Sequence, residues 1–178
     1  LKNPDTVDPA AKKLADKYRT AVAPIANRVV GRITGDITRT ATPAGESALG
    51  DVIADAQLAR TTGDGAQIAL MNPGGIRADF DAEASAGGEA VGEVTYGEAF
   101  TVQPFNNLVV TQTFTGAQLK NVLEQQFPGF GGQTTQRILQ VSAGFTYTWT
   151  STAAPGSKIT AMALNGTPID PAATYRVT

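Results

Sequence analysis

The chain contains neither cysteine nor histidine among its 178 residues. Without cysteine it can form no disulfide scaffold and no thiolate metal site. Without histidine it cannot supply a metal centre of mixed histidine and carboxylate ligands. The absence of cysteine is compatible both with secretion from a bacterium and with a cytosolic location, so it does not decide between the two.

Long apolar runs and an excess of positive charge are missing as well. No run approaches the roughly 20 apolar residues that a membrane helix needs, and the first residues show no signal-peptide pattern. Lys and Arg together number 14 against 16 Asp and Glu, for a net charge of -2. No basic stripe is therefore available to neutralise the phosphates of a nucleic acid. We expect no membrane span and no nucleic-acid polymer as a partner.

The composition predicts a folded chain, because 42% of the residues are apolar and only 17% are charged. Hydrophobic spacing predicts a first helix over residues 9–25, with Asp8 as its N-cap, and Thr115 with Gln118 fits a capping box for a later helix. Helices and strands interleave without a regular βαβ repeat, so we predict an α+β fold with a mixed β-sheet packed against helices. The other predicted helices lie around residues 49–56, over 96–100 and from 116 to Pro128, and the predicted strands cover 29–38, 68–71, 108–114, 145–150, 158–164 and 174–178.

A loop after the predicted strand 68–71 combines an asparagine, two glycines and an arginine. Asn72 precedes Gly74 and Gly75, where the lack of Cβ atoms lets the backbone turn sharply and lets a ligand approach closely. Arg77 can present a planar fork of donors that suits a phosphate or a carboxylate. This pattern predicts an anion-binding loop.

A second segment, Gln103–Asn107, places the aromatic ring of Phe105 beside the amides of Asn106 and Asn107. An aromatic face next to amides can stack on a nucleobase and read its edge. The two segments together predict a nucleotide-binding surface.

Taken in order along the chain, these segments resemble the C-terminal domain of the 5'-nucleotidase family, which includes UDP-sugar hydrolases and 2',3'-cyclic-nucleotide phosphodiesterases. Glu46–Asp51 is similar to the family's E-x-x-L-G-[ND] helix start. Asn72–Arg77 resembles its N-G-G-G-I-R loop, with Pro73 in place of a glycine. Tyr96–Asn107 resembles its aromatic turn before a strand, and 140–145 and 170–177 resemble its closing strands. The resemblance covers residues 29 to 178.

The resemblance implies a division of labour. A separate N-terminal metallophosphoesterase domain would hold two divalent metal ions and hydrolyse phosphoric monoesters, whereas this chain would hold no metal and no catalytic residue. Residues 1–28 would contain the interdomain connecting helix, and 29–178 would form the nucleotide-binding C-terminal domain. Such proteins are secreted, attached to the cell wall or periplasmic.

The resemblance also assigns roles to particular residues. Arg77 would contact the phosphate or the ribose, and Asn72 would lie near the base. Phe105 would be one of two phenylalanines that sandwich the base, with the amide of Asn107 just beyond it. Gly74 and Gly75 would shape the loop.

Two departures from the family pattern limit this assignment. The family places its second stacking phenylalanine and a G-G-D-G segment just after the strand that contains Tyr175 and Arg176, whereas this chain stops at Thr178. The predicted C-terminal domain is therefore shortened at its C-terminus. Some members also carry an arginine just before the helix start, where this chain has 43–45 and its nearest arginine is Arg39.

Structural alternatives stay open for each residue. Gly74 and Gly75 can form an ordinary turn, Arg77 can pair with Asp79 or Asp81, and Phe105 can anchor the core. The whole chain can also be a non-catalytic interaction or scaffold module on a surface, or the substrate domain of a UDP-sugar hydrolase or of a cyclic-nucleotide phosphodiesterase. Glu46 and Asp51 could suggest paired catalytic carboxylates, but we interpret Glu46 as a helix-start residue stabilised by the helix dipole and Asp55 likewise as structural.

Overall fold

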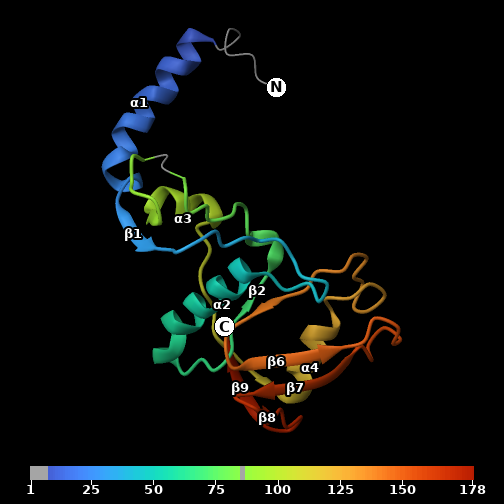
Figure 1. Ribbon diagram of the computed structural model, residues 1–178. Helices are drawn as coiled ribbons and strands as arrows, with labels where there is room; N and C mark the ends of the chain where they lie inside the picture. The colour runs from blue at the N-terminus through green and yellow to red at the C-terminus, as the bar shows by residue number, and fades with distance from the viewer. Residues whose placement is uncertain (1–7, 85–86) are drawn as a thin grey trace. The chain divides into compact units, whose positions relative to one another are not determined.

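The structure is a computed structural model that describes residues 8–84 and 87–178. The chain divides into two compact units. The first unit comprises the residues up to Ile37 together with Phe80–Pro104, and the second comprises Thr38–Asp79 together with Phe105–Thr178. The colours of Figure 1 allow both units to be followed along the chain.

The first unit begins with α1 (Pro9–Ala26). Its N-terminus is capped as predicted, because the Asp8 carboxylate accepts the N–H groups of Ala10 at 2.7 Å and Ala11 at 3.2 Å. No residue of this helix is buried, so its apolar stripe, which includes Leu14 and Tyr18, is exposed.

The rest of the first unit contains one antiparallel pair of short strands and a second helix. β1 (Val29–Arg32) pairs antiparallel with β3 (Glu93–Thr95), and α3 (Tyr96–Val102) follows. The predicted strand over 29–38 is thus too long, because beyond Arg32 only Ile37 forms an isolated bridge, to Phe80. The capping box of Thr95 and Glu98 fixes the start of α3, and the predicted helix over 96–100 is confirmed.

In the second unit, the start of α2 (Ala48–Thr61) lies against the buried amide of Gln140. The 3-10 turn η2 (Thr62–Asp64) follows this helix. Ser47 is the N-cap of α2, and its hydroxyl accepts the N–H of Gly50 at 3.2 Å. The side-chain oxygen of Gln140 accepts the Ser47 N–H at 2.6 Å, and its nitrogen donates to the carbonyls of Gly45 and Ile138. A Cβ at Gly50 would clash with Gln140, so this position of the helix requires glycine.

A mixed sheet connects the strands that carry the predicted site. β2 (Leu70–Met71) pairs antiparallel with β5 (Gln140–Val141), and β4 (Gln112–Thr115) pairs antiparallel with β9 (Thr174–Val177). A parallel bridge from Ile68 to Val177 joins the two pairs, so the strands follow the order β4, β9, β2, β5. The predicted α+β class with a mixed sheet is confirmed.

A second sheet is formed by β6 (Phe145–Trp149), β7 (Ile159–Leu164) and β8 (Thr167–Pro168), all antiparallel. Asn165 and Gly166 form the turn between β7 and β8, with φ of +50° and +78°. It leads into β8, which lies before the predicted strand over 174–178. α4 (Gly116–Glu124) begins at the predicted Thr115 capping box and ends before Pro128. The core of this unit contains Ile68, Leu119, Leu123, Phe127, Ile138, Val141, Phe145, Ile159 and Val177.

Two further local predictions are wrong. The strand predicted over 108–114 begins only at Gln112, and Leu108 is 89% exposed, because no strand lies beside this part of the chain in the described structure. The helical spacing around 49–56 predicts Val52 on the buried face of α2, but its side chain is 44% exposed. The buried face of α2 instead uses Leu49 and Ala54.

Candidate functional site

The loop after β2 is a tight turn held by its own hydrogen bonds. It contains the 3-10 turn η3 (Pro73–Gly75), and the side-chain oxygen of Asn72 accepts the Gly74 N–H at 3.4 Å. Neither glycine has a positive φ, and a Cβ at Gly74 would make only ordinary contact with the Asn72 amide, at 3.4 Å. The turn itself therefore does not require glycine at position 74.

Two arginines converge on this loop. Arg77 donates to the Gly74 carbonyl at 3.3 Å, and Arg39 donates to the Arg77 carbonyl at 2.8 Å. Asp79 accepts the Arg39 N–H at 2.7 Å and lies 3.8 Å from its guanidinium. Because Asp79 pairs with Arg39, the alternative pairing of Asp79 with Arg77 is not formed. The guanidinium of Arg77 is exposed and makes no ion pair with a residue that the structure describes.

Arg39, the arginine nearest to the predicted helix start, is a functional candidate to which the sequence assigned no role. It lies 38 positions before Arg77, whose carbonyl it holds, and no local pattern predicts a contact over that distance. Arg137 is a second such residue: with Pro73 and Ile138 it lines a cavity of about 290 Å³ beside the loop.

Phe105 and Asn107 lie on the exposed segment before β4. The ring of Phe105 is 48% exposed, so it does not anchor the core. Asn107 is exposed as well. Both side chains are accessible to a ligand.

The mixed sheet brings the loop and this segment to one end. β2 runs parallel to β9 and leads into the loop at Asn72, whereas β4 runs antiparallel to β9 and is preceded by Phe105 and Asn107. Both parts of the predicted site therefore flank the end of β9 at Thr178, one on each side.

Carboxylates near the start of α2 do not form a metal centre. One oxygen of Asp51 is buried without a hydrogen-bond partner among the described residues. Burial, together with the charges of Glu46 and Asp55, raises the pKa of Asp51 to about 6. Asp55 accepts the Ala143 N–H at 2.6 Å, which gives it a structural role. Among residues 8–84 and 87–178, no group of three or more acidic side chains could hold a metal ion.

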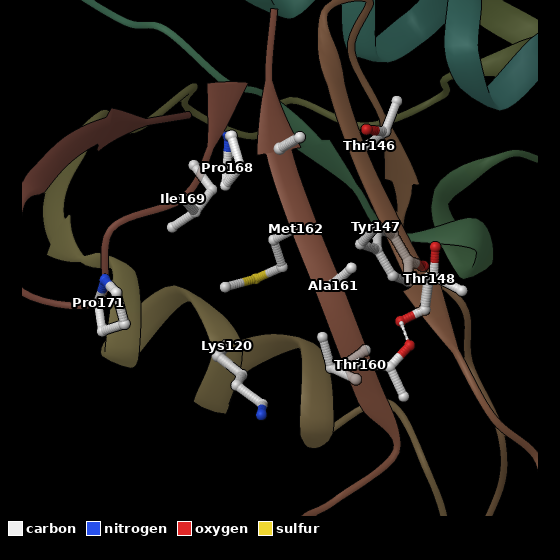
Figure 2. A pocket seen from close by; sticks show the side chains of 12 residues that line it. Lys120, Thr146, Tyr147, Thr148, Thr160, Ala161, Met162, Pro168, Ile169 and Pro171 are labelled. Atoms are coloured by element: carbon white, nitrogen blue, oxygen red, sulfur yellow. Dashed lines mark hydrogen bonds between the residues drawn. The ribbon is translucent and has the colours of Figure 1, made fainter. Parts of the chain in front are cut away.

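A cavity of about 430 Å³ lies elsewhere in the second unit and contains none of the predicted site residues. Figure 2 shows it between β6, β7, the segment 168–171 and Lys120 of α4. Its lining is mostly apolar, including Met162 and Ile169, and burial raises the pKa of its Tyr147 to about 12. The chemistry of the loop at Arg77 suits an anion better, because there a hydrogen-bonded turn and an exposed guanidinium occur together.

Comparison with known proteins identifies the family. The family model described as "5'-nucleotidase, C-terminal domain" matches residues 29–178. The chain belongs to this family. The expected resemblance is thereby confirmed on the same residues that the motifs covered.

Relatives of the chain are much longer proteins. Endonuclease YhcR of Bacillus subtilis is 33% identical over 174 residues, which are 96% of this chain and 12% of that protein. Cell wall protein Lmo0130 of Listeria monocytogenes is 39% identical over 109 residues, 60% of this chain and 13% of that protein. The crystal structure of a 5'-nucleotidase precursor from Thermus thermophilus superposes with a TM-score of 0.77 at 30% identity, over 94% of this chain and 32% of that one. Within the described part of the chain, no helix is long and apolar enough to cross a membrane.

Proposed function

We propose that this chain binds the nucleoside or nucleotide substrate of a larger 5'-nucleotidase-type hydrolase of nucleoside phosphates. The family match and the Thermus 5'-nucleotidase support this class of protein. The observation that carries the proposal is the exposed guanidinium of Arg77, which extends from a hydrogen-bonded loop at the same end of the sheet as Phe105.

In this proposal each part of the site contacts one part of the ligand. Phe105 stacks on the base, which is worth about 1–3 kcal/mol. The amides of Asn72 and Asn107 contact the base or the ribose. Arg77 binds the phosphate or the ribose, and a charge-assisted hydrogen bond of this kind contributes about 1.5–3 kcal/mol. Gly74 and Gly75 keep the loop surface open for close approach.

The metal ions that the family implies do not fit this chain. It has no histidine, and its described carboxylates form no cluster of three that could hold an ion. In the proposal, two divalent ions belong to an N-terminal metallophosphoesterase domain of the same polypeptide. Residues 1–28 would contain the connecting helix to that domain. This chain would bind and orient the substrate, and the protein would be secreted or associated with the cell wall, in line with the name of the Listeria relative.

The test is a titration of this chain with AMP and with adenosine, followed by NMR chemical shifts. We expect shifts at Asn72, Arg77 and Phe105. Arg77→Ala should weaken AMP binding about tenfold or more and adenosine binding less, because only AMP carries the phosphate. Phe105→Ala should weaken both ligands.

The matched controls are Arg60→Ala and Phe100→Ala, which remove an exposed arginine and an exposed phenylalanine that are not part of the proposed site. Both controls should bind like the unchanged chain. If AMP causes no shifts in this chain, and none in a longer polypeptide that contains it, the nucleotide-binding proposal is wrong.

A surface scaffold without ligand binding is the second candidate, and the cell-wall name of the Listeria relative favours it. It predicts no response to AMP, adenosine or a UDP-sugar. A response to a UDP-sugar or a 2',3'-cyclic nucleotide that exceeds the response to AMP would instead assign one of those esters as the substrate.

A further inference from the structure

The cavity of about 430 Å³ in the second unit has walls that are tied together by the backbone. The segment 168–171 forms one wall. Its Ile169 N–H donates to the Met162 carbonyl of β7 at 2.9 Å, and its Pro171 carbonyl accepts the Ala117 N–H of α4 at 3.0 Å. Sites for small molecules have volumes of about 300–1,000 Å³ and are usually preformed. The cavity therefore has the size and the fixed walls of a small-molecule site.

The interior of the cavity is aliphatic. Met162 and Ile169 are half-buried, because they pack against the core and line the cavity as well. Figure 2 shows the Met162 side chain extending from β7 toward Ile169 and Pro171. Methionine is flexible and adapts its shape to different apolar groups. This lining favours a ligand with a hydrocarbon body.

One cation lies at the edge of this apolar lining. Lys120 of α4 is exposed, and it is the only charged side chain among the residues that line the cavity in the described structure. In Figure 2 its side chain extends between α4 and β7, with the nitrogen directed away from Met162 and Ile169. A lysine in this position can cover apolar surface with its methylene groups while its ammonium group stays in water.

The acidic side chains beside these walls do not compensate this charge. Glu124, one turn after Lys120, is buried and accepts the Ile159 N–H at 2.7 Å. Asp170, next to the lining residues, accepts the Ala172 N–H at 2.9 Å. Lys120 forms no ion pair with either of them or with any other residue that the structure describes. Its positive charge is therefore available to a ligand.

We propose that this cavity binds a small amphipathic carboxylate of the fatty-acid class. Its hydrocarbon chain lies over Met162 and Ile169, and its carboxylate pairs with the ammonium group of Lys120. A lone ammonium group is a compact point charge and matches a ligand with one negative charge, whereas a phosphate is better held by the planar fork of an arginine.

This site is separate from the candidate nucleotide site. Pro171 lies just before the start of β9 at Thr174, whereas the loop at Arg77 and the segment at Phe105 flank the other end of β9. Binding at the cavity therefore does not depend on the proposed function.

The test is a titration of this chain with decanoate, below the concentration at which decanoate forms micelles, followed by NMR chemical shifts. We expect shifts at Lys120, Met162 and Ile169. Affinity should rise by about threefold for each methylene added from hexanoate to decanoate, because each added group is buried. Decylammonium has the same hydrocarbon chain with the opposite charge and should bind several-fold more weakly. No nucleotide is present, so the result is separate from the test of nucleotide binding.

Two variants test the two parts of the site. Lys120→Met should weaken decanoate binding by about threefold to fivefold, the range of an exposed ion pair, and should leave the binding of uncharged decanol unchanged. Ile169→Ala should weaken both ligands, because it removes apolar contact. The matched control is Lys13→Met, which removes an exposed lysine of α1 and should bind both ligands like the unchanged chain.

Four results would overturn the proposal. They are the absence of shifts, equal affinity for decanoate and decylammonium, unchanged decanoate affinity in Lys120→Met, and shifts spread over apolar residues exposed elsewhere, such as Leu14 and Leu108. The last result would indicate adsorption without a site. The same shifts are expected in a longer polypeptide that contains this chain. Their loss there would show that another part of the protein covers the cavity, which would also overturn the proposal.

Discussion

The loop at 72–79 and the segment at 105–110 lie at the same end of one sheet, yet they are held very differently. The loop has the turn of η3, the contact from Arg77 to Gly74 and the support of Arg39. The segment has no hydrogen bond to another described residue. The difference indicates that the Arg77 side of the candidate site is preorganised in this chain, whereas the Phe105 side is not.

The reason for the difference is the number of neighbours that each part has in the sheet. The loop follows β2, which lies between β9 and β5. The segment precedes β4, which in the described structure pairs with β9 alone. A binding site formed at such a place needs support from both sides, because free backbone and side-chain entropy must be lost when a ligand orders it.

Gly50→Ala should have the largest effect on stability, and it acts in α2, on the side of the candidate site that contains the 72–79 loop. A Cβ at this position clashes with Gln140, which holds the start of α2. We expect the free energy of unfolding to fall by about 3 kcal/mol, as for an overpacked core that also loses buried hydrogen bonds. Gly63→Ala is the control, because a Cβ there meets nothing within 4 Å. Equal midpoints for both variants in urea unfolding would contradict the prediction.

Arg39→Ala should loosen the loop without disturbing the aromatic segment. It removes the donor to the carbonyls of Ile76 and Arg77 and the partner of Asp79. We expect a loss of about 1–2 kcal/mol in local stability, seen as faster amide exchange in 72–79. Exchange in 105–110 should stay as it is, and Arg60→Ala should change neither region. Unchanged exchange in the loop would show that Arg39 does not support it.

Asp51→Asn tests whether the raised pKa of Asp51 in α2 makes the stability of the chain depend on pH. The folded pKa of about 6 exceeds the ordinary value of 3.8, so between these values the folded chain binds more protons than the unfolded one. Its stability therefore falls as pH rises through this range, and the penalty is fully present above pH 6. At pH 8 the variant should be more stable by about 1 kcal/mol, allowing for screening by water, and the gain should vanish near pH 4. An equal gain at both pH values, measured by urea unfolding, would rule out this titration as the cause.

Gly74→Ala has the smallest expected effect on stability. It tests whether the loop contacts the ligand directly. The turn can hold a Cβ at this position, so the free energy of unfolding should change by less than about 0.5 kcal/mol. If AMP lies close to the loop, its affinity should nevertheless fall several-fold, because the Cβ occupies the surface that the ligand approaches. The measurement is an AMP titration beside urea unfolding. Unchanged affinity would remove Gly74 from the binding surface.

Local sequence signals predicted much of the fold. Asp8 and Thr115 marked helix starts that the structure confirms, since caps act within one helical turn. Asn165 and Gly166 are a further local signal, because both adopt the positive φ that their turn requires. The strand predicted over 108–114 begins too early, because Leu108 and its neighbours have the composition of a strand but no partner strand among the described residues.

The candidate site was predicted only as separate pieces. Local pattern selected Asn72, Gly74, Gly75 and Arg77 as one piece and Phe105 with Asn107 as another, and their role in binding stays a prediction. The contact from Arg39 could not be read from sequence, because it joins positions 38 apart through the folding of α2 and β2.

The sequence by itself determined the class of this protein: the capping residues, the glycine loop and the absence of histidine all depend on residue type and short spacing. Only the tertiary structure decided that β9 lies between β2 and β4 and so brings both pieces to one end of the sheet. It also decided that Asp79 pairs with Arg39, which leaves the Arg77 guanidinium exposed. The physical reason is that strand order and ion-pair choice depend on contacts between distant segments, and such contacts are established only when the whole chain packs.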